Sequence, residues 1–426
     1  MNHQETAPGP NREVVSRHIR SILPKLVHPA KGKLPYPALG VGYGQHYAGY
    51  IYCWDNHHMS LRFAAGGEPE QMKFFLGNML ACQTPLGFIP SIINIATGGI
   101  GQVGPWHAWP WLAQNAATHL DLTGDTAWTT EVFPKLELYL RHWTARHAAP
   151  HDLYRWREAY HTYDNEIVLS TCSDPDSILS PDLNSSLYLE LRCMSFLAGA
   201  IGETEKQREY IERAEVLKDA VNHWLWDDEL ESYGAHNLLT GRCQISYRST
   251  LDGDVGSLSS DVGRFAYLSS TALMPLYAGI APSDRAERMI RSYVLSPDHF
   301  RSPFGIRSLS KASEFYNQAR WGNPGRSGDR RRLTNSNWQG PVWVPLSWFV
   351  FHALLHYGFK NEAESLADDT QKVLAGCIGQ FGYMRENYHA ETGEGLYADH
   401  FASWNILADI MHDFLPGRKA PFRLFT

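Results

Sequence analysis

Apolar side chains recur at helical spacing along most of the chain. Between residues 68 and 83, one apolar stripe is formed by Met72, Phe75, Leu76, Met79 and Leu80. Amphipathic segments of this kind occur at about 12–24, 68–83, 107–122, 125–146, 204–227, 283–294 and 360–377. Segments that are apolar on most sides occur at about 55–66, 183–201, 261–279, 342–358 and 400–415. The periodicity therefore predicts an all-α protein of about twelve helices.

The two kinds of segment alternate along the chain. Two concentric rings would produce this alternation, because inner helices are covered on most sides while outer helices show one face to water. Long connections containing glycine, proline and aromatic residues lie at about 30–54, 84–106, 147–182, 229–260, 296–341 and 378–400. Long loops in a compact domain are usually functional, so we expect a site where they meet, with short β-hairpins among them.

The first residues of the sequence differ in composition from the rest of the chain. Residues 1–11 are rich in proline, glycine and polar side chains, which predicts a disordered tail. No linker-like change of composition follows, so residues 12–426 are expected to form a single domain.

Composition and charge narrow the function. Aromatic residues make up 12% of the chain, with 14 Trp and 21 Tyr. Flat aromatic rings fill cores, and they also stack on the apolar faces of sugar rings, so both interpretations stay open. The formal net charge of −7 argues against nucleic acid as the main partner, since no basic field attracts phosphates.

The cysteines and the N-terminus indicate a compartment. The six cysteines are scattered without a CxxC pair, which is typical of free thiols in a reducing compartment and not of a disulfide framework or a zinc site. No apolar signal segment opens the sequence, and no run of 18 apolar residues could span a membrane. We therefore expect a cytoplasmic protein without a metal ion; its oligomeric state is left open.

Three clusters carry carboxyl groups in the expected loops. The first ends in Trp54 and Asp55, where Asp55 would serve equally well as a helix cap. The second contains Asp174 and Asp176. The third contains Glu386, which lies between two tyrosines in a partly dry setting. Glu391 and Glu394 follow in a Thr-Gly turn, where we expect them to be solvated. Two carboxyl groups are what the hydrolysis of a glycosidic bond requires.

A set of motifs in a fixed order carries a family resemblance. They are WD at 54–55, GFIP at 87–90, DLN at 182–184, NWQGPVW at 337–343, and a late glutamate at 386 followed by a Thr-Gly turn and FASW at 401–404. Together they resemble the trehalase and α-glucosidase I clan and, within it, glycoside hydrolase family 63. The smaller bacterial members of that family cleave mannosylglycerate and glucosylglycerate. The resemblance covers about residues 44–404 and implies that residues 12–426 are one catalytic (α/α)6 barrel.

The resemblance also implies catalytic roles. A small α-glucoside or α-mannoside would be hydrolysed with inversion and without a cofactor. Asp174 matches the general acid best, although its loop, TCSDP, lacks the glycine, methionine and asparagine of the family's loop, and Asp176 is the alternative. Glu386 matches the general base, and Asp55 matches the aspartate that helps to orient the water.

Further residues are expected to contact the substrate. Trp54, Trp338 and Trp343 would flank the glycosyl unit. The remaining predicted contacts are Gln45, Tyr50, His107, Arg157, Asp176, Tyr316, Gly340, Tyr388 and Trp404. The arginine-containing loop at 320–332 could clamp an anionic leaving group such as glycerate, or it could simply be a solvated loop.

Two other functions are considered. An (α/α)6 sugar epimerase would use histidine bases, for which His57, His58 and His107 are the candidates among 20 histidines. A non-catalytic sugar-binding relative would explain the altered loop around Asp174. Turnover of a free sugar, or binding without turnover, would distinguish these from a hydrolase.

Overall fold

Helices make up most of the structure. The computed structural model describes residues 9–44, 46–101, 106–157, 175–238, 241, 268–313, 315–320 and 336–425. Its main helices are α1 (Pro10–Leu26), α2 (Cys53–Ala65), α3 (Glu70–Ala81), α4 (Leu112–Thr123), α5 (Thr126–Arg146), α7 (Pro181–Ala200), α8 (Thr204–Trp224), α9 (Met274–Tyr277), α10 (Ser283–Met289), α12 (Val344–His356), α13 (Lys360–Phe381) and η6 (Ser403–Phe414). Shorter helical turns are η2 (Pro175–Ser177), η4 (Ser270–Leu273) and η5 (Ile290–Val294).

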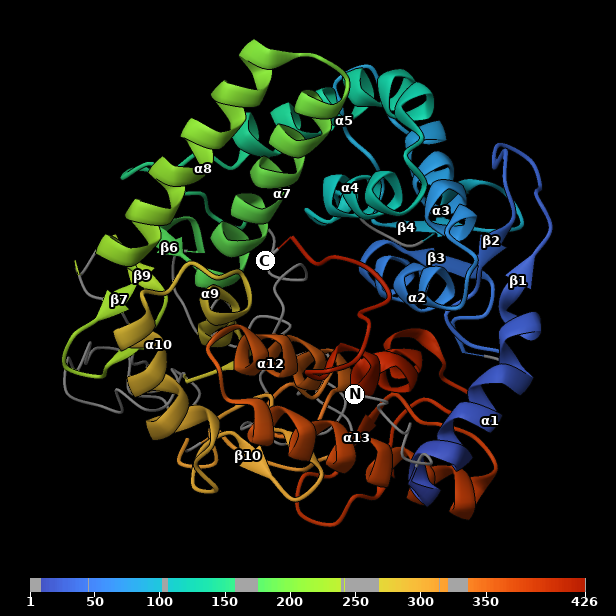
Figure 1. Cartoon of the computed structure of the whole chain (residues 1–426), viewed down its shortest axis with the longest axis vertical. Helices are drawn as coiled ribbons and strands as arrows, with labels where there is room; N and C mark the ends of the chain where they lie inside the picture. Colours follow the sequence, from blue (N-terminus) through green and yellow to red (C-terminus); the bar gives the residue numbers. More distant parts are fainter. Residues whose placement is uncertain are drawn as a thin grey trace, which may run out of the picture.

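These helices form two rings. In Figure 1, α2, α4, α7, α9 and α12 surround the middle of the molecule, and α3, α5, α8, α10, α13 and α1 lie outside them. Helix η6 packs against α2 and α12 and closes the inner ring. Along the described chain, outer and inner helices alternate. The predicted (α/α)6 barrel is confirmed.

Burial explains why each helix takes its ring. Every residue of α12 from Val344 to Leu354 is buried. In α8 the buried residues are Tyr210, Ala214, Leu217, Ala220 and Val221, a single stripe. A helix that is apolar all round lies inside, and one with a single apolar stripe lies outside.

Helix α4 differs from the prediction. The sequence of segment 107–122 predicts an amphipathic helix, yet α4 lies in the inner ring and buries every residue from Leu112 to Leu120. Its polar side chains meet protein instead of water: Asn115 Nδ2 donates to Ser60 Oγ at 2.8 Å, and Thr118 Oγ1 donates to Gln114 O at 3.0 Å. A polar stripe that is satisfied internally looks the same in the sequence as a solvated one.

Short antiparallel strands occupy the connections. They are β1 (Val27–His28), β2 (Ala38–Leu39), β3 (Tyr50–Tyr52), β4 (Ile92–Asn94), β5 (Gly99–Ile100), β6 (Ile178–Leu179), β7 (Trp226–Asp227), β8 (Ser232–Tyr233), β9 (His236–Asn237), β10 (Arg301–Ser302), β11 (Gly305–Ile306), β12 (Asn387–Tyr388) and β13 (Gly395–Leu396). Strands β3, β4 and β5 form one sheet, and β12 pairs with β13. Among the described helices, none is long and apolar enough to cross a membrane.

Candidate active site

Two acidic residues from distant parts of the chain lie close together. Asp55 is in the first turn of α2, and Glu386 directly precedes β12. Both are buried, with 4% and 5% of their surface exposed. The backbone N–H of Glu386 donates to Ala398 O at 3.1 Å, across the β12–β13 hairpin. The helix start and the hairpin therefore hold the two carboxyl groups in fixed places.

Burial changes the acidity of both groups. Burial and the nearby charge of Asp55 together raise the pKa of Glu386 to about 8, against the opposing effect of hydrogen bonds from the Ala398 backbone and from Tyr47. Burial raises the pKa of Asp55 to about 7, against the hydrogen bond from Ser403. Neighbouring buried carboxyl groups with raised pKa values are typical of acid–base sites.

One oxygen of Glu386 has no hydrogen-bond partner among the described residues. This oxygen, Oε2, is buried. A buried acceptor without a partner costs free energy, and a catalytic role is one of the reasons for which such an atom is retained. An atom of this kind can take a proton from a bound water.

Tryptophans form a wall beside the carboxyl groups. The ring of Trp54 stacks on Trp109 with centroids 4.8 Å apart and lies 4.9 Å from Trp404. Trp338 stacks on Trp343 at 4.1 Å, and Trp338 lies 5.9 Å from Trp54. Trp54 is partly exposed, whereas the other four are buried. The structure thus brings together the four tryptophans predicted here and adds Trp109.

Backbone hydrogen bonds join this wall to Glu386. Val342 N donates to Tyr388 O at 2.7 Å, and Tyr388 N donates to Val342 O at 2.9 Å. Trp404 Nε1 donates to Glu386 O at 3.4 Å, and Trp343 Nε1 donates to Asn337 O at 3.0 Å. The NWQGPVW segment is therefore a backbone partner of the strand that follows Glu386.

Gly340 and Tyr388 serve the framework of the site. Gly340 has φ +147, and a Cβ there would lie 2.4 Å from Asn317 O, so glycine is required. Tyr388 is fully buried, and its hydroxyl donates to Arg385 O at 2.9 Å. The sequence predicts both as substrate contacts, and this stays a prediction beside the structural roles described here.

The DLN segment stabilises the loop before α7. Asn184 Oδ1 accepts from Tyr154 N at 2.8 Å, and its Nδ2 donates to Tyr154 O at 2.9 Å. Asp182 is fully buried and accepts from Trp156 Nε1 at 3.0 Å. Both residues of the motif are thus bridges that hold the preceding loop.

The predicted general acid lies outside the described residues. Asp174 belongs to the undescribed range 158–174, and Gln45 is undescribed as well. Asp176 is exposed in η2, where its carbonyl accepts from Arg155 Nη1 at 2.7 Å. Both assignments of the acid therefore remain predictions.

Three other predicted contacts have partners within the protein. His107 is buried beside Phe88 and Trp143, and Ile89 N donates to its Nδ1 at 3.0 Å. Arg157 Nε donates to Arg146 O at 2.6 Å. Tyr50 belongs to β3, directly before α2, and its ring centroid lies 6.2 Å from that of Tyr52.

Tyr316 belongs to an ion-pair network. Its hydroxyl donates to Glu391 Oε1 at 2.7 Å, and the buried Arg307 donates to the same oxygen through Nη2 at 2.8 Å. The sequence predicts a solvated Glu391; the residue is exposed, and it is also paired with Arg307. Arg307 is distant in sequence, so no local pattern indicates it.

Three residues near the pair are missing from the sequence prediction. Trp109 lies in the aromatic run WHAWPW at 106–111, a signal that could have indicated it. Tyr47 has φ +62 and packs edge-on against Phe401 at 5.9 Å. Ser403, whose hydroxyl donates to Asp55 Oδ1 at 2.6 Å, stands in the FASW motif itself.

The histidines of α2 are packed into the interior. His57 stacks on Trp111 with centroids 4.9 Å apart, and His58 Nδ1 bonds Trp54 O at 2.7 Å. Burial lowers the pKa of His58 to about 4. In the described part of the chain, no group of three or more His, Cys, Asp or Glu residues could hold a metal ion, and Cys53, Cys82, Cys193 and Cys377 are free.

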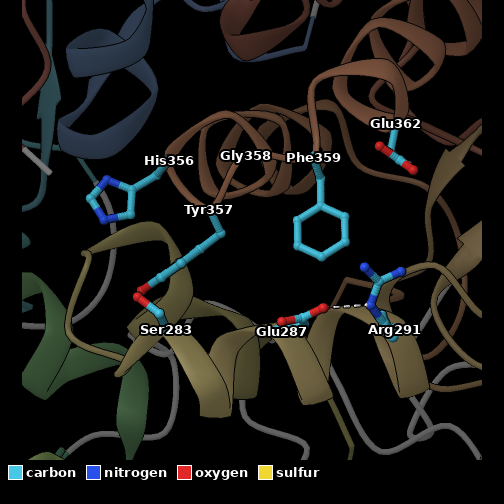
Figure 2. A pocket seen from close by; sticks show the side chains of 8 residues that line it. All are labelled: Ser283, Glu287, Arg291, His356, Tyr357, Gly358, Phe359 and Glu362. Carbon is cyan, nitrogen blue, oxygen red and sulfur yellow. Dashed lines mark hydrogen bonds and ion pairs between the residues drawn. The ribbon is translucent and has the colours of Figure 1, made fainter.

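A cavity of about 610 Å³ lies elsewhere, on the outer ring. Figure 2 shows Ser283, Glu287 and Arg291 facing the turn between α12 and α13, which carries Tyr357 and Phe359. Glu287 is paired with Arg291 at 2.9 Å, and the Arg291 guanidinium lies over the Phe359 ring. The residues that line this cavity include no pair of buried carboxyl groups, so it does not resemble a hydrolytic site.

Comparisons with known proteins agree with this geometry. The barrel is similar to the GH63 mannosylglycerate hydrolase from Thermus thermophilus in complex with glucose, with a TM-score of 0.67 and 18% identity over 94% of this chain and 99% of that one. The same Thermus hydrolase in complex with Tris and D-glycerate has a TM-score of 0.64 and 17% identity over the same shares of the two chains. At these identities the likeness shows the fold.

Sequence comparison identifies the family. A mannosylglycerate hydrolase of Rubrobacter radiotolerans is 27% identical over 258 residues, which cover 59% of this chain and 48% of that protein, so the match spans about half of the relative. Residues 48–404 match the family model of the mannosylglycerate hydrolase MGH1-like glycoside hydrolase domain. The predicted resemblance is confirmed: the chain belongs to this family of glycoside hydrolases.

Proposed function

We propose that this chain is an inverting glycoside hydrolase that cleaves a small α-glucoside or α-mannoside. The observation that carries the proposal is the buried Glu386, which lies beside Asp55 and has one carboxyl oxygen without a hydrogen-bond partner among the described residues. An inverting glycosidase needs such a carboxylate to activate water, with a second carboxylic acid to protonate the leaving oxygen.

Each acidic residue has a proposed role. Glu386 takes a proton from the attacking water, and Asp55 orients that water. A buried base with a raised pKa holds the proton firmly once it has received it. Asp174 donates a proton to the glycosidic oxygen, and Asp176 is the alternative donor. In an inverting enzyme the acid and the base are roughly 6.5–9.5 Å apart, a separation that a ligand-bound crystal structure would measure.

The proposed substrate is a small glycoside, either glycerate-linked or an α-linked disaccharide. Mannosylglycerate hydrolases are among the relatives, and the Thermus protein has been crystallised with glucose and with D-glycerate. The arginines of the 320–332 loop are the proposed clamp for a carboxylate; of this loop, the structure describes Arg320. Residues 12–426 are proposed to act as one catalytic domain.

A substrate panel with product analysis tests the proposal. Purified protein is incubated with mannosylglycerate, glucosylglycerate and α-linked disaccharides, and the first sugar released is observed by ¹H NMR. We expect the β-anomer to appear first from an α-glycoside. An α-anomer would overturn the role of Glu386, and epimerisation of a free sugar would support the alternative function.

A loop variant tests the leaving-group clamp separately. Neutralising Arg326, Arg330, Arg331 and Arg332 together should raise KM for glycerate-linked substrates and leave KM for neutral disaccharides unchanged. Equal KM values for wild type and variant on the anionic substrates would remove the clamp from the proposal.

A further inference from the structure

Ser403, near the end of the chain, contacts Asp55. Ser403 is the first residue of η6, and none of its surface is exposed. Its hydroxyl donates to Asp55 Oδ1 at 2.6 Å, across 348 residues of sequence. A short hydrogen bond to a carboxylate is stronger than one between neutral groups and constrains direction as well as distance.

The backbone of Ser403 is held in an unfavourable conformation. Its φ is +27, a region that residues with a Cβ rarely adopt. Two N–H groups, those of Ala402 and Ser403, donate to Val41 O at 3.1 and 2.9 Å, and Phe401 N donates to Met384 O at 3.1 Å. These bonds keep the strained turn in place, and strain that is fixed from several sides is typical of functional sites.

The hydroxyl of Ser403 stabilises the charged form of Asp55, which burial disfavours. Burial raises the pKa of Asp55, and the hydrogen bond from Ser403 lowers it. The titratable groups whose pKa values the charge of Asp55 raises are Glu386, Tyr52 and Cys53, none of which is a cation. Without the serine, Asp55 would lose a donor that both stabilises its charge and fixes its rotamer.

We propose that Ser403 is a positioning residue: it orients the carboxylate of Asp55 toward the water that Glu386 deprotonates. The inference rests on the proposed hydrolase function, because it assigns Ser403 an effect through Asp55. Nothing in the reaction requires Ser403 to touch the substrate.

Two variants separate the hydroxyl from the backbone. Ser403→Ala removes the hydroxyl and keeps the Cβ, whereas Ser403→Gly removes the hydroxyl and relieves the positive φ. Both should lower kcat roughly 10-fold to 100-fold with KM nearly unchanged, because a reacting group is then misplaced. The matched control is Ser60→Ala in α2, the helix that carries Asp55. The buried Ser60 hydroxyl donates to His57 O at 2.7 Å, not to a carboxylate, and accepts from Asn115 Nδ2 at 2.8 Å. This control should keep the wild-type kcat.

A titration that needs no activity gives the second readout. The carboxyl ¹³C signal of Asp55, identified by its absence in Asp55→Asn, is followed against pH in aspartate-labelled protein. Loss of the hydrogen bond to the charged form should raise the Asp55 midpoint by about one pH unit in both Ser403 variants and leave it unchanged in Ser60→Ala.

The two readouts keep the two proposals apart. An unchanged midpoint together with wild-type kcat in Ser403→Gly would overturn the role of Ser403. A raised midpoint in a protein that hydrolyses none of the panel substrates would retain the hydrogen bond but refute the hydrolase function. A lower kcat with an unchanged midpoint would mean that Ser403 affects the turn and not Asp55, which also contradicts the inference.

Discussion

Two glutamates of one hairpin occupy opposite environments. Glu386 precedes β12, and Glu391 lies in the turn between β12 and β13, five positions later. Burial and the charge of Asp55 raise the pKa of Glu386 to about 8. Burial also raises the pKa of Glu391, but hydrogen bonds from Tyr316 and Arg307 and the charge of Arg307 outweigh it and leave that pKa below its ordinary value.

The difference separates the carboxyl group that we propose to be reactive from one that is paired within the framework. Glu391 Oε1 accepts from both Arg307 and Tyr316, so its charge is compensated and the loop that carries Tyr316 is tied to the hairpin. Glu386 has an oxygen without a partner in the described structure and incurs a desolvation cost when it ionises. The same side chain therefore stabilises the fold at one position and is available for chemistry at the other.

Removing the Glu386 carboxylate should have a much larger effect on activity than removing that of Glu391. Glu386→Gln should lower kcat on the order of 10²–10⁴-fold, the usual contribution of a general base. Glu391→Gln should keep kcat per folded molecule within a few-fold, because its role is structural. Glu394→Gln, an exposed carboxyl of the same turn, is the control and should match wild type. Similar losses of kcat in Glu386→Gln and Glu391→Gln would contradict the proposed difference between the two carboxyl groups.

Removing the cations that pair with Glu391 should lower the stability of the protein. Arg307 is 1% exposed and donates to Glu391, to Pro297 O at 3.0 Å and to Arg301 O. Arg307→Met should lower the free energy of unfolding by about 3 kcal/mol, since a buried network loses its cation. Lys311 also pairs with Glu391, with its Nζ 3.4 Å from Glu391 Oε2, but 45% of the lysine side chain is exposed. Lys311→Met should therefore lower the free energy of unfolding by less than about 1 kcal/mol. Denaturant unfolding measures both; equal costs would contradict the account.

The contributions of Glu386 and Glu391 to stability should depend on pH with opposite signs, and this is the smallest of the expected effects. The folded pKa of Glu386 lies above its unfolded value, so its contribution to stability is present below about pH 4.3 and is lost as pH rises through about 8. The difference in Tm between Glu386→Gln and wild type should therefore be more positive at pH 9 than at pH 4, by roughly 1–3 °C. The lowered pKa of Glu391 stabilises the protein above about pH 4.3, and this is lost as pH falls through the folded value. Glu391→Gln should lower Tm at neutral pH and have little effect in strong acid, which thermal unfolding across pH would measure.

Periodicity predicts the two rings but not every helix. Inner and outer helices differ in how many of their sides are apolar, and that difference is local to each segment. The sequence predicts an amphipathic α4 because the polar stripe of that helix is satisfied by other protein groups, such as Ser60, which the sequence does not place nearby.

The sequence predicts those residues of the candidate site that stand in recognisable motifs. Trp54, Asp55, Trp338 and Glu386 stand in motifs whose order is informative, and the structure gathers them. The partners that decide acidity come from elsewhere in the chain: Ser403 for Asp55, and Arg307 for Glu391. Contacts over such separations depend on the closed ring, so the sequence does not distinguish Glu391 from a solvated carboxylate.

The most direct test measures the two glutamates in one sample. Carboxyl ¹³C signals of glutamate-labelled protein are titrated, with Glu386 and Glu391 identified from their glutamine variants. We predict a midpoint near 8 for Glu386 and a midpoint below the ordinary value of about 4.3 for Glu391. If Glu386 titrates at or below about 4.3, or if both midpoints coincide, the environments do not differ as described and Glu386 is not the perturbed base of this site.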